Sequence, residues 1–310
     1  MISWRNPDVR HRAWGIDVYG QAILDALDAT LSVAGADAGT VLGFCSGGTL
    51  QSMALAALQQ RGELTDKVAG FALAVCVLDQ AEAGMAAAAL DESTARLATT
   101  ASATRGYLDG RTLAEIFAWL RPNDLIWNYW VNNYLMGHAP KAFDILYWNA
   151  DSVRMSAAMH RDFMELALNN GLTVPGGARM LGSDIDLGKV DTDTYVVAGI
   201  ADHLCQWESC YRTTQLLGGD TRFILSTSGH IASMVNPPGN PKASYQTAPE
   251  NPPEAEDWLE SATKVRGTWW EDYVGWLAER TGPERKRSRG PGSVAYAPIC
   301  DAPGTYVLDR

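Results

Sequence analysis

The sequence has few cysteines and no long apolar run, and these shortages exclude several classes of protein. Its 310 residues include five cysteines, and no two of them form a CxxC pair. A disulfide framework or a structural zinc site is therefore not expected, and a reducing cytoplasm is the expected location. The longest strongly apolar run, residues 69–78, is too short to span a bilayer, and the first residues lack the apolar stretch of a signal peptide.

Basic residues are outnumbered by acidic ones, since 25 Lys and Arg stand against 36 Asp and Glu, and the formal net charge is -11. This balance argues against general binding to nucleic acid or to an anionic membrane. Hydrophobic residues make up 46% of the chain and charged residues only 20%, which indicates a globular protein with a large core.

Strand and helix patterns alternate on both sides of a long insertion. Short apolar runs predict strands at residues 2–4, 40–44, 68–78, 194–200 and 221–226. The run at 221–226 is predicted to be the last strand. Helical spacing or composition predicts helices at residues 14–33, 49–60, 207–217 and 257–278. The insertion opens with an alanine-rich stretch, becomes aromatic and helical at 113–135, and contains another helix at 152–169. This order implies a mostly parallel sheet flanked by helices, with the insertion as a cap.

Four segments follow from this pattern. Residues 1–79 form the first part of the core, 80–190 the cap insertion, and 191–282 the second part of the core. Residues 283–310, rich in Pro, Gly and Arg, form an extended tail.

Cys45 lies in Gly-Phe-Cys-Ser-Gly, a G-x-C-x-G pattern between a predicted strand and a predicted helix. This is the context of a nucleophile elbow, in which a sharp turn exposes the nucleophile and the helix amino terminus favours a thiolate. The alternative is a buried structural thiol flanked by turn glycines. The strand–helix context favours the elbow.

An acid and a histidine follow in the order that an elbow requires. Asp202 follows the strand at 194–200, and His230 follows the strand at 221–226. His230 would take the proton of Cys45, and Asp202 would orient His230. Alone, Asp202 could be a helix cap and His230 a surface histidine. His203 is a second candidate, for binding substrate or tuning the acid, or a solvated loop residue.

No metal site is predicted. The remaining histidines have no partner at metal-ligand spacing, and they are His11, His138 and His160. Cys205 and Cys210 do not match a zinc pair, and Cys76 lies in an apolar strand and is predicted to be core.

Several motifs resemble those of poly(3-hydroxyalkanoate) synthases along essentially the whole chain. They are the start Ile-Ser-Trp-Arg-Asn-Pro-Asp at 2–8, the elbow at 43–49, Asn-Tyr-Leu-Met-Gly at 133–137, Phe-Asp-Ile-Leu-Tyr-Trp-Asn at 143–149, Ala-Gly-Ile-Ala-Asp-His at 198–203, Ser-Gly-His-Ile at 228–231, Asn-Pro-Pro-Gly-Asn-Pro-Lys at 236–242 and Ala-Pro-Gly-Thr-Tyr-Val at 302–307.

The resemblance implies an α/β-hydrolase fold with a helical cap, and an acyltransferase that polymerises (R)-3-hydroxyacyl-CoA with release of CoA. Cys45 would hold the acyl chain as a thioester, with His230 as general base and Asp202 as the acid. The backbone N–H of Ser46 would donate to the oxyanion, and the cap would exclude water. It also implies no cofactor, a homodimer formed through the cap, and a cytoplasmic place at the surface of polyester granules with possible granule-associated proteins.

Only 44 residues precede Cys45, which leaves room for one strand and one helix where this fold usually has several strands. We therefore expect the first strands of the usual sheet to be missing, as in a carboxyl-terminal catalytic fragment. Whether such a chain acts alone is left open.

Two other functions fit the same residues. One is a thioesterase or depolymerase that uses the same Cys-Asp-His triad with water as acceptor. The other is a truncated, non-catalytic fragment associated with granules. The sequence does not fix the acyl chain length, because one methylene changes binding by only about 1–3 kcal/mol.

Overall fold

The computed structural model describes residues 1–81, 91–120, 122–140, 151–284, 286, 290–302, 304–305 and 308. These residues fall into two compact units. The larger is drawn from Ile16–Ala88 and Leu166–Ala302, and the smaller from Met1–Gly15, Ala89–Glu165 and Pro303–Arg310. The insertion therefore contributes to both units.

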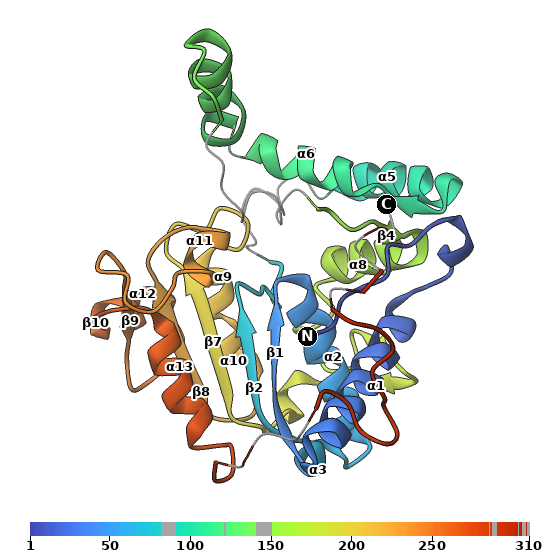
Figure 1. Ribbon diagram of the computed structural model, residues 1–310, viewed down its shortest axis with the longest axis vertical. Coiled ribbons are helices and arrows are strands. Elements are labelled where there is room, and N and C mark those ends of the chain that lie inside the picture. Colours follow the sequence, from blue (N-terminus) through green and yellow to red (C-terminus); the bar gives the residue numbers. More distant parts are fainter. Residues whose placement is uncertain are drawn as a thin grey trace. The chain divides into compact units, whose positions relative to one another are not determined.

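A six-stranded sheet forms the centre of the larger unit (Figure 1). Its strands, in spatial order, are β1 (Gly39–Phe44), β2 (Val68–Ala74), β7 (Thr194–Gly199), β8 (Thr221–Ser226), β9 (Ser244–Thr247) and β10 (Thr263–Arg266). The first four strands are parallel, and β9 and β10 each run antiparallel to the preceding neighbour. This confirms the predicted mostly parallel sheet. The parallel strands all end at one edge, where their following loops converge.

Aromatic side chains pack on both faces of the sheet. Phe223 of β8 is the register partner of Val196, so both point to one face and Tyr195, next to Val196, points to the other. On one face Phe223 contacts Trp258 edge-on, with ring centroids 4.8 Å apart. On the other face Tyr195 packs against Tyr273 at 5.0 Å. Both strand residues are completely buried, so these clusters fix the helices on the sheet.

Helices and short elements surround the sheet in the larger unit. They are α1 (Ile16–Ala34), α2 (Ser46–Gln60), α3 (Leu64–Lys67), the hairpin of β5 (Arg179–Met180) and β6 (Ser183–Asp184), η4 (Leu187–Lys189), α9 (Trp207–Tyr211), α10 (Thr213–Leu216), α11 (His230–Met234), α12 (Ala255–Ser261) and α13 (Trp269–Ala278). Residues 48–58 of α2 are all buried, and most of them are apolar or small.

The smaller unit is mainly helical. It contains η1 (Val9–His11), α5 (Glu92–Arg105), the pair β3 (Tyr107–Leu108) and β4 (Met155–Ser156), α6 (Gly110–Leu120), two π-helical segments η2 (Asn123–Trp127) and η3 (Trp130–Leu135), and the start of α8 (Ala157–Asn169). The aromatic helical segment predicted at 113–135 is confirmed. Many of its apolar side chains are exposed, such as Trp119 at 64% and Tyr134 at 71%. None of the helices in the described residues is long and apolar enough to cross a membrane.

Several predicted elements differ from the structure. β8 is not the last strand, because β9 and β10 follow it. The helix predicted at 257–278 is divided into α12 and α13 by β10, whose residues pair with β9, and by Gly267 at φ 114°. Residues 2–4 belong to no strand. Pairing with a neighbour, rather than local composition, decides whether such short runs become strands.

Part of the predicted pattern lies outside the described residues. This applies to most of the alanine-rich opening of the insertion, to the motif at 143–149, and to several residues of the tail motif at 302–307. The strand predicted at 68–78 ends at Ala74, because Val75 adopts φ 46°.

Candidate active site

Cys45 occupies the sharp turn between β1 and α2, as the strand–helix context predicted. It is the N-cap of α2 with φ 48° and ψ -130°, a conformation that residues with a side chain rarely adopt. Its backbone N–H donates to the carbonyl of Ala74 in the neighbouring strand at 2.9 Å. Its side chain is half-buried. The turn therefore presents the thiol at the carboxyl edge of the parallel strands.

Two glycines allow the strand and the helix to meet at this turn. A Cβ on Gly43 would lie 2.5 Å from the Cα of Gly48, and a Cβ on Gly48 would lie 2.8 Å from the sulfur of Cys76. Gly47, the last glycine of the G-x-C-x-G pattern, has open space around its Cα. The close approach of β1 and α2 therefore depends on Gly43 and Gly48, whereas a side chain at Gly47 would meet open space.

Asp202 and His230 come together from the two loops that follow β7 and β8. His230 Nδ1 donates to Asp202 Oδ2 at 2.7 Å, and the Asp202 side chain is fully buried. Ser228, at φ 86°, accepts a hydrogen bond from the Ala201 N–H at 3.1 Å and so joins the two loops. The structure thus brings the predicted acid and histidine into direct contact.

Asp202 also stabilises its own loop. Its Oδ1 accepts the backbone N–H groups of Leu204 at 2.8 Å and Cys205 at 3.0 Å. Asp202 is not the cap of the next helix, because the N-cap of α9 is Gln206, and its side chain holds the loop before that helix instead. One carboxylate uses one oxygen for the loop and the other for the ring.

The thiol of Cys45 lies near His230. The sulfurs of Cys45 and Cys205 and a ring nitrogen of His230 all lie within 4.8 Å of one another. The structure therefore joins all three predicted triad residues and adds a second thiol.

The surroundings of Cys45 favour its thiolate. A hydrogen bond from the Cys205 thiol holds the pKa of Cys45 well below its usual value, and burial opposes this shift. The His230 ring and the backbone N–H of Ser46 also stabilise the anion. Burial disfavours the charged His230 ring, but hydrogen bonds to Asp202 and Cys45 raise its pKa to about 10. These surroundings favour a thiolate–imidazolium pair, which is the reactive state of a cysteine nucleophile.

Cys205 was not recognised from the sequence as a site residue. Its hydrogen bond to Cys45, together with burial, raises the pKa of Cys205 well above its usual value, so it stays a neutral thiol donor. Its position three residues after Asp202, on a loop at the catalytic edge, was the available signal. The spacing rule for zinc could not reveal this cluster, because its members come from three separate loops. The absence of a metal ion stays a prediction.

The other candidates lie around this centre or away from it. His203 is half-buried beside Asp202, and its role stays a prediction. His160 accepts or donates a hydrogen bond with Ser102 at 2.7 Å in the smaller unit, and burial lowers its pKa. Cys76 is buried in the core as predicted, and burial raises its pKa to about 12.

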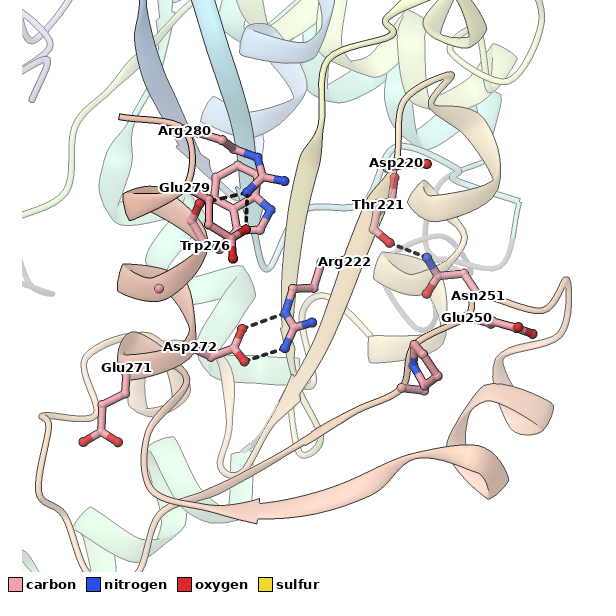
Figure 2. Close-up of a pocket in the computed structure, with 13 residues that line it drawn as sticks. Asp220, Thr221, Arg222, Glu250, Asn251, Glu271, Asp272, Trp276, Glu279 and Arg280 are labelled. Atoms are coloured by element: carbon pink, nitrogen blue, oxygen red, sulfur yellow. Dashed lines mark hydrogen bonds and ion pairs between the residues drawn. The ribbon is translucent and has the colours of Figure 1, made fainter. Parts of the chain in front are cut away.

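A cavity of about 810 Å³ lies at the other end of the strands (Figure 2). Its lining includes Thr221 and Arg222 at the start of β8, whereas His230 follows the end of that strand. The two cations in its lining are paired, Arg222 with Asp272 at 2.5 Å and Arg280 with Asp193 at 2.7 Å. The cavity is therefore separate from the thiol centre.

A family model described as the alpha/beta hydrolase fold matches residues 1–237. Among curated proteins, the chain is 46% identical over 310 residues to poly(3-hydroxyalkanoate) polymerase 2 of Ectopseudomonas oleovorans, covering all of this chain and 55% of that protein. It is 44% identical to polymerase 1 of the same organism, with the same coverage. It is 38% identical to poly(3-hydroxyalkanoate) polymerase subunit PhaC of Cupriavidus necator, covering 99% of this chain and 53% of that protein. The chain thus spans about half the length of these relatives.

Proposed function

Because the chain belongs to the alpha/beta hydrolase fold family, we propose that it carries the catalytic centre of an acyltransferase that polymerises (R)-3-hydroxyacyl-CoA into a polyester. The names of its relatives support this substrate and product class. One observation carries the proposal: Cys45 stands on a strained turn with its sulfur within 4.8 Å of the His230 ring, and His230 is hydrogen-bonded to the buried Asp202.

Cys45 and His230 begin the proposed reaction. The thiolate of Cys45 attacks the thioester carbonyl of the substrate, and a tetrahedral oxyanion forms. The Ser46 N–H at the start of α2 donates to that oxyanion. The His230 imidazolium donates its proton to the CoA sulfur as that thiolate leaves. The acyl group is then held on Cys45 as a thioester.

Elongation uses the same groups in reverse roles. The neutral His230 ring takes the proton of a 3-hydroxyl group, and the resulting alkoxide attacks the carbonyl of an acyl thioester. The C–S bond breaks, an ester bond forms, and the thiolate of that thioester leaves beside the His230 imidazolium. Asp202 holds the ring in position and stabilises its positive charge. Cysteine at the nucleophile position favours acyl transfer, because a thioester exchanges readily with an incoming alcohol.

We propose further features of the chain. The insertion at 80–190 is a cap that excludes water and forms a homodimer contact, which its exposed aromatic side chains favour. His203, beside Asp202, binds substrate. The protein acts in the cytoplasm at the surface of polyester granules, with granule-associated proteins as partners. The reaction needs no cofactor, because the residues at the thiol centre supply nucleophile, base and oxyanion donor.

Incubation of the chain with 3-hydroxybutyryl-CoA tests the proposal. We expect release of CoA, a mass increase of one acyl group on the peptide that contains Cys45, and a polyester product. Cys45→Ala should lose all three. Free 3-hydroxybutyrate without polymer would assign the chain to the hydrolases instead. If Cys45 stays unmodified and no CoA is released, the proposal is wrong and the chain is a non-catalytic fragment.

A further inference from the structure

Two thiols of different character stand side by side at the catalytic centre. The sulfurs of Cys45 and Cys205 lie within 4.8 Å of each other, and both lie within 4.8 Å of a ring nitrogen of His230. We infer that a hydroperoxide oxidises Cys45 and that Cys205 then closes a reversible Cys45–Cys205 disulfide, so Cys205 is the resolving thiol of an oxidation site. This inference does not depend on the acyl acceptor or on the substrate of the chain.

Cys45 is the sulfur that a peroxide attacks. It is half-buried, whereas Cys76, Cys205 and Cys210 are buried. It stands at the amino terminus of α2 with the Ser46 N–H and the His230 ring beside it, an arrangement that keeps the sulfur anionic. Peroxides react with thiolates rather than with thiols. A small oxidant therefore meets one reactive and accessible sulfur at this centre.

Cys205 is placed to react with the oxidised form. Its backbone N–H is held by Asp202, the carboxylate that also holds His230. It lies in the loop between β7 and α9 and not within a strand or helix. A disulfide requires the two sulfurs to approach to about 2.05 Å. The loop position allows this approach without disturbing the sheet.

The chemistry balances with a hydroperoxide as the only co-reactant. The Cys45 thiolate attacks one peroxide oxygen, the O–O bond breaks, and the His230 imidazolium gives its proton to the leaving oxygen. Cys45 is now a sulfenic acid, oxidised by two electrons. Cys205 gives its proton to the neutral ring and attacks the Cys45 sulfur, and the expelled hydroxide takes that proton to become water. With hydrogen peroxide, the products are one disulfide and two molecules of water.

The disulfide has two consequences for the protein. It removes the nucleophile, so acyl transfer stops while the bond persists. It also prevents a second oxidation of Cys45 to sulfinic acid, which thiols do not reverse. A reductant therefore restores the thiolate. Without Cys205 the same exposure would inactivate Cys45 permanently.

The test uses the full chain with Cys300→Ser, because Cys300 is exposed and could link two molecules. Hydrogen peroxide is added, and the cysteine thiols that remain free are then blocked. Peptides are mapped by mass spectrometry without reduction. We expect one linked peptide pair that contains Cys45 and Cys205, and loss of iodoacetamide labelling at Cys45. Dithiothreitol should restore the labelling fully.

Two variants make the result specific. In Cys205→Ser, peroxide should convert Cys45 to sulfinic acid, and dithiothreitol should no longer restore labelling. Cys210→Ser is the matched control, since Cys210 is a buried thiol nearby in the chain but not in the cluster, and it should behave like the parent. A linked pair other than Cys45 and Cys205, or equal recovery of the parent and Cys205→Ser, would overturn the inference. Peptide mapping of the parent decides the question even if the variant folds poorly.

Discussion

The carboxylate of Asp202 accepts the backbone N–H of Cys205 at 3.0 Å with one oxygen and the His230 ring at 2.7 Å with the other. This buried group therefore positions the base and the second thiol together. The ring of His230 and the sulfur of Cys205 both lie within 4.8 Å of the Cys45 sulfur. A change at Asp202 should act on the nucleophile through the ring and leave the loop intact when the substitute still accepts hydrogen bonds.

Asp202→Asn separates these two roles. Its amide oxygen can accept the Cys205 N–H, but the negative charge beside His230 is lost. We expect the pKa of His230 to fall and the thiolate of Cys45 to become less stable. The rate of Cys45 alkylation by iodoacetamide should drop, and the drop should be larger at pH 5 than at pH 7, because less of the thiolate survives at low pH. An unchanged rate would mean that Asp202 does not support the charged pair. His230→Gln should cause a larger drop.

The reactivity of Cys45 should persist to lower pH than that of a free cysteine. Its pKa is lowered, so the thiolate is present above that lowered value and is lost only as the pH falls through it. A free cysteine loses its thiolate below about pH 8.5. Alkylation rates measured between pH 5 and 9 should therefore stay nearly flat for Cys45 across the neutral range. A curve that follows a free cysteine measured in parallel would contradict the charged pair.

Gly48 and Gly47 form a matched pair for the packing of the elbow. Gly48→Ala places a methyl group 2.8 Å from the Leu73 side chain and from the Cys76 sulfur, so we expect a loss of about 1–3 kcal/mol in the free energy of unfolding. Gly47→Ala meets no atom within 4 Å and lies inside α2, where alanine is favoured by about 1 kcal/mol. Urea unfolding measures both. Equal effects would show that the close approach at Gly48 does not limit packing.

The sequence predicts the triad because each member follows its own strand. Cys45, Asp202 and His230 come after β1, β7 and β8, and the carboxyl ends of parallel strands meet at one edge. Local patterns therefore place all three residues in one region. Their contact distances depend on the loops, and the sequence does not contain that information directly.

Cys205 and the last two strands show why other features were missed. The contact between Cys205 and Cys45 is tertiary, and no spacing along the chain encodes it. β10 has only four residues, mostly exposed, and its pairing with β9 overrides the helical spacing that spans it. Gly267 at φ 114° then separates it from α13, a conformation that composition alone does not reveal.

Asn170 and the pair Asp79–Gln80 flank the part of the insertion, Ala89–Glu165, that belongs to the smaller unit, and Asn170 joins these two flanks within the larger unit. Its side chain accepts the Gln80 N–H at 2.8 Å and donates to Asp79 at 2.8 Å, and Asp79 also pairs with Arg212 at 3.0 Å. Its backbone has φ 46°, which asparagine tolerates better than alanine does. Asn170→Ala should therefore lose two hydrogen bonds and add backbone strain, at a cost of about 2 kcal/mol in the free energy of unfolding.

Asn170→Gly distinguishes the two contributions. Glycine loses the same hydrogen bonds but adopts positive φ without strain, so its cost should be smaller than that of alanine by about 1 kcal/mol. Urea unfolding of the three proteins measures the difference. If alanine and glycine cost the same, backbone strain does not contribute at this position. If neither variant is destabilised, the hydrogen bonds of Asn170 do not hold the two flanks together, and the pairing of Asp79 with Arg212 is sufficient.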